Sequence, residues 1–103
     1  MATSLITAQT AAKDSDQITV GGLSPYKVGE VAIVGWGFST DTADIQISYN
    51  GGTNFIDLYI GGTQIQMSDT KNYYLLPGPG VYRVQKGITT GTVGFALSNP
   101  FSP

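Results

Sequence analysis

Acidic side chains are the first candidates for chemistry in this chain. Asp14 and Asp16 stand two positions apart in a polar segment, and Asp41 and Asp44 flank an expected turn. Each pair can offer carboxylate oxygens to Ca²⁺, which takes about six to eight oxygen ligands. Neither pair is part of a calcium loop with its full set of ligands. We therefore favour capping of turns over metal binding and expect no metal site.

A single pair of carboxylates falls on expected strands. Glu30 and Asp57 form this pair, and a glycosidase needs two carboxylates that face one another across a cleft. The sequence does not place them together, and each suits a solvent-facing position on a strand. Histidine and cysteine are both absent, so the commonest general base and the thiolate nucleophile are missing. These observations predict a protein that is not an enzyme.

Aromatic side chains offer a second kind of chemistry, which is stacking on sugar rings. Trp36, Tyr73 and Tyr74 are the candidates. Trp36 lies inside the apolar run EVAIVGWGF, which favours a place in the core. Tyr73 and Tyr74 are adjacent, so on a strand they face opposite sides and one of them is exposed. An exposed tyrosine suits a protein interface as well as a sugar, and both alternatives stay open.

Arg83 is the basic residue that lies within a regular element, the expected strand VYRVQ. Its guanidinium group can pair with Asp57 or Glu30 across neighbouring strands. Alternatively, it can anchor a contact with another protein, because arginine is enriched in binding hot spots. The sequence does not decide between these two roles.

The composition limits the elements that can position these residues. The chain has 103 residues, of which 41% are hydrophobic, which is enough for one domain with one core. Only 12% are charged and the net charge is -2, so nothing indicates binding to nucleic acid or to an anionic membrane. No apolar run approaches the roughly 18 residues of a membrane span, and the first residues lack the pattern of a signal peptide.

Short strands are predicted along most of the chain, and no segment has a helical apolar period. Ile45, Ile47 and Tyr49 alternate with polar residues, as do Ile56, Leu58 and Ile60 with their neighbours. Similar runs recur between residues 17 and 98. We therefore predict an all-β, single-domain antiparallel β-sandwich or jelly roll of about seven to eight short strands.

Glycines separate these strands. Asn50-Gly51-Gly52 and Gly61-Gly62 lie between alternating runs, where asparagine and glycine tolerate the positive φ angles of a tight type I′ turn. A phosphate cradle would require a helix after the glycines, and strands follow instead. Both groups are expected to turn the chain. Gly35 and Gly37 interrupt another strand, which suggests a bulge or the close approach of a neighbouring backbone.

The first 16 residues are small and polar. We interpret residues 1–16 as an N-terminal arm or extended lead-in and residues 17–103 as the β-sandwich domain, with a short first strand as the alternative.

Two stretches, IQISYNGGTNFIDL and LLPGPGVYRVQKGITTGTVGFAL, carry a family likeness. A Ser-x-Asn-Gly hairpin followed by Thr-Asn-aromatic, a proline-containing turn and a strand with arginine resembles small structural proteins of tailed bacteriophages, including head decoration proteins. The likeness extends over about residues 17 to 98. Its motif residues are Ser48, Asn50, Gly51, Thr53, Asn54, Phe55, Pro77, Tyr82 and Arg83.

This resemblance implies a virion protein, made in the host cytoplasm, that binds the lattice of the major capsid protein on the outer surface of the head, often as a trimer. It implies neither catalysis nor a cofactor. A tail or fibre component and a carbohydrate-binding β-sandwich module are the alternatives. The N-terminal segment is the leading contact because an added strand binds through its main chain. The candidate contact residues are Thr3, Ser4, Leu5, Ile6, Thr7, Tyr73, Tyr74 and Arg83.

Overall fold

The computed structural model describes residues 2–22 and 26–98, and this part of the chain is all-β, as predicted. Its strands are short because glycines, bulges and an inserted hairpin interrupt them. Their bounds are β1 Ala2–Gln9, β2 Lys13–Asp14, β3 Ile18–Val20, β4 Ala32–Trp36, β5 Ala43–Ser48, β6 Phe55–Asp57, β7 Tyr59–Ile60, β8 Thr63–Gln64, β9 Gln66–Met67, β10 Tyr73–Leu75, β11 Gly80–Lys86 and β12 Val93–Ser98.

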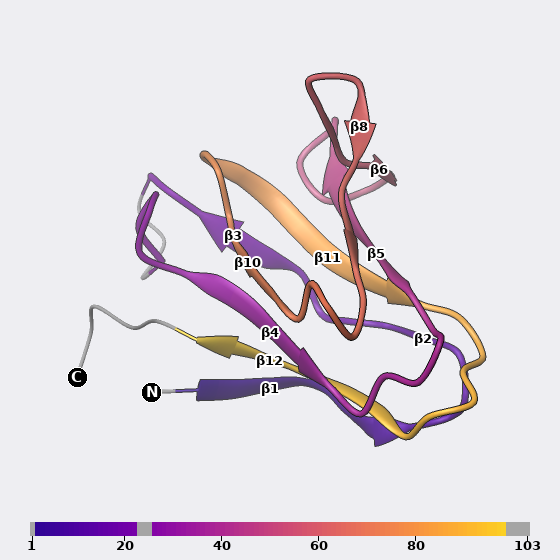
Figure 1. The fold of residues 1–103 in the computed structure, drawn as a ribbon. Helices are drawn as coiled ribbons and strands as arrows, with labels where there is room; N and C mark the ends of the chain where they lie inside the picture. The colour runs from indigo at the N-terminus through magenta and orange to yellow at the C-terminus, as the bar shows by residue number, and fades with distance from the viewer. Residues whose placement is uncertain (1, 23–25, 99–103) are drawn as a thin grey trace.

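Two antiparallel sheets form the body of the molecule (Figure 1). Sheet A has the order β1-β12-β4-β10. Sheet B has the order β2-β11-β5-β6, with β3 also paired to β11 and β9 also paired to β5. Since β2 and β3 follow one another along β11, and β6 and β9 follow one another along β5, each sheet has four strand positions. Apart from β7 and β8, which form their own hairpin, the strands of the two sheets thus fill about as many strand positions as were predicted.

The break between β2 and β3 is closed by a side chain. Ser15 donates its backbone N–H to the Val84 carbonyl at 2.9 Å, and its Oγ accepts the Val84 N–H, also at 2.9 Å. The hydroxyl group donates in turn to the Asp16 carbonyl. A serine hydroxyl therefore replaces a main-chain acceptor at a bulge, and the ladder with β11 resumes at Ile18.

The segment between β6 and β9 leaves sheet B and returns to it. Leu58 donates its N–H to the Ile45 carbonyl and accepts the N–H of Ile65 at its own carbonyl, which closes the base of the excursion. The Leu58 side chain is buried, whereas β7 and β8 form a separate hairpin that stands away from the sandwich (Figure 1). The regular alternation predicted through residues 56–60 therefore ends at Leu58.

The core lies between the inner faces of the two sheets. On β11, Tyr82 and Val84 point inward, and Ile45 does so on β5. Phe95 on β12 is fully buried and meets the Phe38 ring edge to face, with centroids 5.7 Å apart. The other buried apolar side chains of sheets A and B include Ile6, Ile18, Val20, Ile33, Met67, Val93 and Leu97.

The N-terminal segment is not a separate arm, which corrects the division at residue 16. β1 pairs with β12 at the edge of sheet A, from Ala2 opposite Ser98 to Gln9 opposite Val93. Ile6 is 1% exposed and belongs to the core. Weak periodicity concealed this strand, because only one of its described side chains is fully buried and two register shifts interrupt it.

Both glycine groups turn the chain, as predicted, but by different means. Gly61 and Gly62 form the two-residue loop between β7 and β8, and their φ angles of 61° and 82° suit a type I′ turn. The Asn50 turn is longer than predicted, because β5 and β6 stop at Ser48 and Phe55. Asn50 does not adopt positive φ. Its side chain instead accepts the Asn54 N–H at 2.7 Å and so shapes a wider loop.

Gly35 in β4 and Gly37 just after it allow the close approach of neighbouring groups, as predicted. At Gly37, an added Cβ would lie 2.0 Å from the Thr92 carbonyl oxygen, so a neighbouring backbone occupies that space. At Gly35, the Phe38 and Phe95 rings occupy the space that a side chain on residue 35 would need. The strand can therefore pass closely under both neighbours only because these two positions lack side chains.

A carboxylate fastens two loops at one end of the sandwich. Asp41 accepts the backbone N–H groups of Ser39, Thr90 and Gly91, and the Thr90 hydroxyl group also donates to it. These hydrogen bonds, led by those from Thr90 and Gly91, lower the pKa of Asp41 below its ordinary value of 3.8. Asp41 therefore caps a turn, which is the role that the sequence favoured for it.

Replacement of Ile6 tests whether β1 is part of the folded domain. We expect Ile6→Ala to lower the free energy of unfolding by about 2–5 kcal/mol, because it empties space in the core. Thr7→Ala changes an exposed neighbour on the same strand and should alter it by less than about 0.5 kcal/mol. Urea unfolding measures both. Equal, small effects would show that residues 2–9 are not held in the sheet.

The pH dependence of stability tests the Asp41 contacts. A lowered pKa in the folded state means that the carboxylate stabilises the fold above the ordinary pKa, and that this contribution is lost as the pH falls through the lowered value. The difference in melting temperature between the wild type and Asp41→Asn should therefore be largest near neutral pH and shrink in acid. Thermal unfolding over a pH series measures it, and a constant difference would contradict this assignment.

Candidate interaction site

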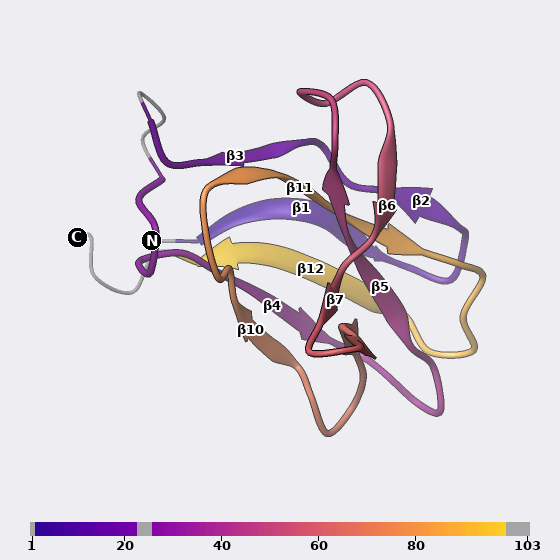
Figure 2. The same cartoon turned by 90° about the horizontal axis from the view of Figure 1, so that it is seen from above.

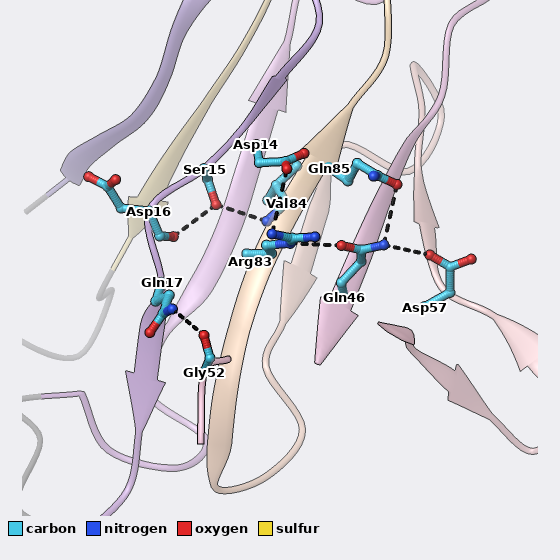
Figure 3. A network of polar contacts seen from close by, with 10 residues as sticks. All are labelled: Asp14, Ser15, Asp16, Gln17, Gln46, Gly52, Asp57, Arg83, Val84 and Gln85. Carbon is cyan, nitrogen blue, oxygen red and sulfur yellow. Dashed lines mark hydrogen bonds and ion pairs between the residues drawn. The ribbon is translucent and has the colours of Figure 1, made fainter. Parts of the chain in front are cut away.

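A row of polar side chains crosses the outer face of sheet B (Figure 3). Gln46 on β5 is its centre and is only 7% exposed. Its Oε1 accepts the Arg83 Nε–H at 2.8 Å, and its Nε2 donates to Asp57 at 3.0 Å and to Gln85 at 3.3 Å. Gln46 therefore uses both ends of its amide to join three strands.

Arg83 extends this row to the edge of the sheet. Its Nη1 lies 3.5 Å from a carboxylate oxygen of Asp14 on β2, and its guanidinium carbon lies 4.3 Å from the centre of the Phe55 ring. The predicted pairing with Asp57 is therefore indirect, through Gln46, and Arg83 forms its ion pair with Asp14 rather than with Glu30. Since its contacts are already made within the chain, Arg83 is poorly placed to anchor a partner.

Lys86 was not singled out from the sequence. It is 1% exposed, and its Nζ donates to the carbonyls of Ala11 at 2.6 Å and of Gly87 at 3.1 Å. Burial lowers the pKa of Lys86, while the charge of Asp41 acts in the opposite direction. The sequence did contain a signal that Lys86 is buried, because it shares one face of an alternating strand with Tyr82 and Val84. These contacts hold the ends of several segments together, which is a structural role.

Exposed apolar side chains gather between residues 49 and 60. Tyr49 is 65%, Ile56 is 52%, Tyr59 is 58% and Ile60 is 44% exposed. They lie on the β5–β6 loop, on β6 and on the β7–β8 hairpin, and we call them the hairpin patch. In Figure 1, β6 and β8 lie on the side of sheet B that faces away from β1 and β12, and Figure 2 shows the β5–β6 loop and β7 on opposite sides of β6. Single exposed apolar residues are ordinary on a surface, and these four lie on a loop, an edge strand and a hairpin at one side of sheet B.

The predicted N-terminal contact residues lie on β1. Thr3 is opposite Leu97, and Ser4 is opposite Ala96 in the ladder. The side chains of Ser4 and Thr7 are exposed, that of Leu5 is half-buried and that of Ile6 is in the core. The segment is therefore not free to add itself as a strand to another protein. Only the outer edge of β1 and its exposed side chains face solvent.

The tyrosine pair lies on β10, at the opposite edge of sheet A. Tyr73 is 53% exposed, and Tyr74 packs against the core, so the prediction that one of the two is exposed is confirmed. The prediction that Trp36 lies in the core is wrong, because its side chain is 45% exposed. Ile33 and Gly35 take the inward positions of β4, and Trp36 therefore points outward, where its ring lies over Gly94. Tyr73 and Trp36 lie on sheet A, whereas Arg83 lies on sheet B. Tyr73 is on the edge strand opposite β1, and the Trp36 ring meets the space above Gly94 that Ala8 of β1 also borders.

Comparison with known proteins identifies no relative: no family model, curated protein or solved structure matches this chain. Within residues 2–22 and 26–98, no three or more acidic, histidine or cysteine side chains are grouped so that they could hold a metal ion. The same part of the structure contains no helix suited to crossing a membrane.

Truncation of Gln46 tests the polar row. We expect Gln46→Ala to lower the free energy of unfolding by about 1–3 kcal/mol, because three polar partners lose a half-buried contact. Gln66→Ala is the matched control: Gln66 is exposed and donates to Asp44 alone, so a change within about 0.5 kcal/mol is expected. Chemical unfolding compares the two. If both variants behave alike, the row does not stabilise the sheet.

Proposed function

We propose that this chain is a non-catalytic structural protein of a bacteriophage virion, and that it decorates the outer surface of the head by binding the lattice of the major capsid protein. It is made in the host cytoplasm and stabilises the shell. The resemblance of its hairpin and proline-turn motifs to phage decoration proteins suggests the virion. The observation on the structure that supports this proposal is the hairpin patch.

The hairpin patch suits a protein partner. Branched aliphatic side chains such as Ile56 and Ile60 gain free energy by leaving water for a matching apolar pocket, at about 25 cal/mol per Å² buried. Tyr49 and Tyr59 add the amphipathic aromatic groups that interfaces favour. The polar row holds the base of this element to sheet B through Gln46 and Asp57. Such an element can insert into a partner without reorganisation of the sandwich.

The connectivity of the strands also supports the proposal of a structural virion protein. The chain passes from one sheet to the other after β1, β3, β4, β9, β10 and β11, apart from the β7–β8 insertion. We infer that the order, β1-β12-β4-β10 against β2/β3-β11-β5-β6/β9, is that of a jelly roll. This arrangement recurs in viral capsid and lectin domains.

Multivalency allows a small patch to be enough for stable binding to a lattice. A single hairpin buries less area than the roughly 1,200–2,000 Å² of a standard interface, so one copy alone would bind weakly. If three copies form a trimer, each contact raises the effective concentration of the others, and avidity can exceed single-site affinity by about 10²–10⁴. A trimer that presents three hairpin patches to a symmetric lattice is therefore the form that we propose.

A tail or fibre component is the second candidate from the same class of particle. The two candidates differ in stoichiometry, because a decoration protein saturates repeated lattice sites. Quantitative mass spectrometry of purified particles should give a simple ratio of this chain to the major shell protein. A handful of copies per particle would instead indicate the tail, and absence from particles would overturn both.

Replacement of Tyr59 and Ile60 tests the hairpin patch directly. We expect Tyr59→Ser with Ile60→Ser to weaken binding to shells that lack this protein by about 2 kcal/mol or more, roughly 30-fold. The melting temperature should hardly change, because both side chains are exposed. Co-sedimentation of the purified protein with such shells measures the binding.

Ile88→Ser provides the control for apolar surface in general. Ile88 is 85% exposed and lies on the loop between β11 and β12, away from the hairpin. Its replacement should leave shell binding unchanged. If this variant lost binding and the double variant kept it, the loop, not the hairpin patch, would be the contact.

A further inference from the structure

A cavity of about 340 Å³ opens between the edges of the two sheets. Residues 63–66 of β8 and β9 line it on the side of sheet B, and residues 70–74, which lead into β10, line it on the side of sheet A. Its volume falls within the range of small-molecule sites, about 300–1,000 Å³. No residue of the hairpin patch lines this cavity, although Tyr59 and Ile60 on β7 pair with Gln64 and Thr63 of the lining.

The lining of this cavity carries neutral polar groups on a surface that is more apolar than polar. Amide and hydroxyl groups come from Gln64, Gln66, Thr70 and Asn72, and among the described residues of the lining Lys71 carries a charge. Within the described residues, the side chains of Gln64 and Asn72 make no hydrogen bond, whereas Gln66 donates its Nε2 to Asp44 at 2.7 Å, and the hydroxyl groups of Thr70 and Ser68 lie 3.4 Å apart. Donors and acceptors of this kind match the hydroxyl groups of a polyol.

Charge distinguishes this cavity from the other large one. The second cavity, of about 540 Å³, is lined by Lys13, Asp14 and Asp44 together with Lys86. Three of these groups are already engaged, Asp14 with Arg83, Asp44 with Gln66 and Lys86 with main-chain carbonyls. A ligand would have to displace charged contacts there, whereas Gln64 and Asn72 in the cavity beside β10 offer amide groups that make no side-chain hydrogen bond within the described residues.

Two aromatic rings lie next to the polar lining. Tyr73 lines the cavity and is 53% exposed. It is opposite Val34 in the ladder, and Trp36 follows two positions later on the same outer face of sheet A. Such diagonal neighbours have Cα atoms about 7–8 Å apart. Since the Trp36 ring covers Gly94 and is 45% exposed, it offers a face to solvent beside Tyr73.

We propose that the cavity between β8–β9 and β10, together with Trp36 and Tyr73, binds an oligosaccharide of neutral sugars. Tyr73 and Trp36 stack on the apolar faces of successive rings, and Gln64, Thr70 and Asn72 hydrogen-bond to their hydroxyl groups. The backbone fixes this arrangement, because the Gly35 N–H donates to the Asn72 carbonyl at 2.9 Å and so holds residue 72 against β4. The site shares the β7–β8 hairpin with the hairpin patch through Gln64, but it uses none of the patch residues.

Trp36 provides a direct readout, because it is the only tryptophan of the chain. The purified protein is titrated with cello-, malto-, xylo- and manno-oligosaccharides while the Trp36 emission is recorded. We expect a saturable shift with at least one of them. Tyr73→Ala should weaken this binding by about tenfold, and Tyr73→Phe, which keeps the ring, should restore most of it.

Tyr49→Ala is the matched control, since Tyr49 is 65% exposed but belongs to the hairpin patch. It should bind sugars as the wild type does. The proposal is overturned if none of these sugars gives a saturable change, or if Tyr73→Ala binds as tightly as the wild type. Neither result would affect the binding of shells through the hairpin patch, so the two proposals fail separately.

Discussion

The structure depends above all on the pairing of β11 with strands on both of its sides. β5 joins it along one edge, and β2 and β3 join it along the other, so β11 is the strand through which all of sheet B is connected. Its inward residues, Tyr82, Val84 and Lys86, belong to the buried interior, and its outward residue Arg83 holds the polar row. With no disulfide available in a chain that lacks cysteine, this pairing and the core beneath it must supply the stability.

The two faces of β11 explain why the proposed contacts lie elsewhere. Its outer face is already occupied by hydrogen bonds among Arg83, Gln46 and Asp57, which leave little for a partner to satisfy. Exposed apolar groups occur instead where the chain departs from the sheets. The hairpin patch carries branched aliphatic side chains on a projecting element, which suits an apolar pocket in a protein. Trp36 and Tyr73 present rings beside amide and hydroxyl groups, which suits a sugar.

Alternation in the sequence predicted the class of fold because side chains on successive strand residues face opposite sides, as Ile45 and Ile47 do on β5. Position within the sheet was harder to predict. Trp36 lies in an apolar run, yet it points outward because Gly94 leaves room for its ring on the outer face, and that glycine is distant in sequence. The sequence singled out both rings of the proposed sugar site, Trp36 and Tyr73, although it favoured a place in the core for Trp36. Residues of the hairpin patch look like ordinary alternating strand residues until the break at Leu58 places them outside the core.

The N-terminal strand shows how an edge can be present without serving as a site. β1 forms one edge of sheet A and turns unpaired main-chain groups outward, which would ordinarily invite strand addition by another protein. Its ladder with β12, however, shifts register between Ser4 and Ile6 and again between Ile6 and Gln9. Such irregularities bend a strand and interrupt the even spacing that a new strand would need. Ile6 also holds β1 to the core, so β1 cannot leave the sheet without exposing a buried side chain. The two proposed contacts, on the hairpin patch and beside β10, use exposed side chains instead of this edge.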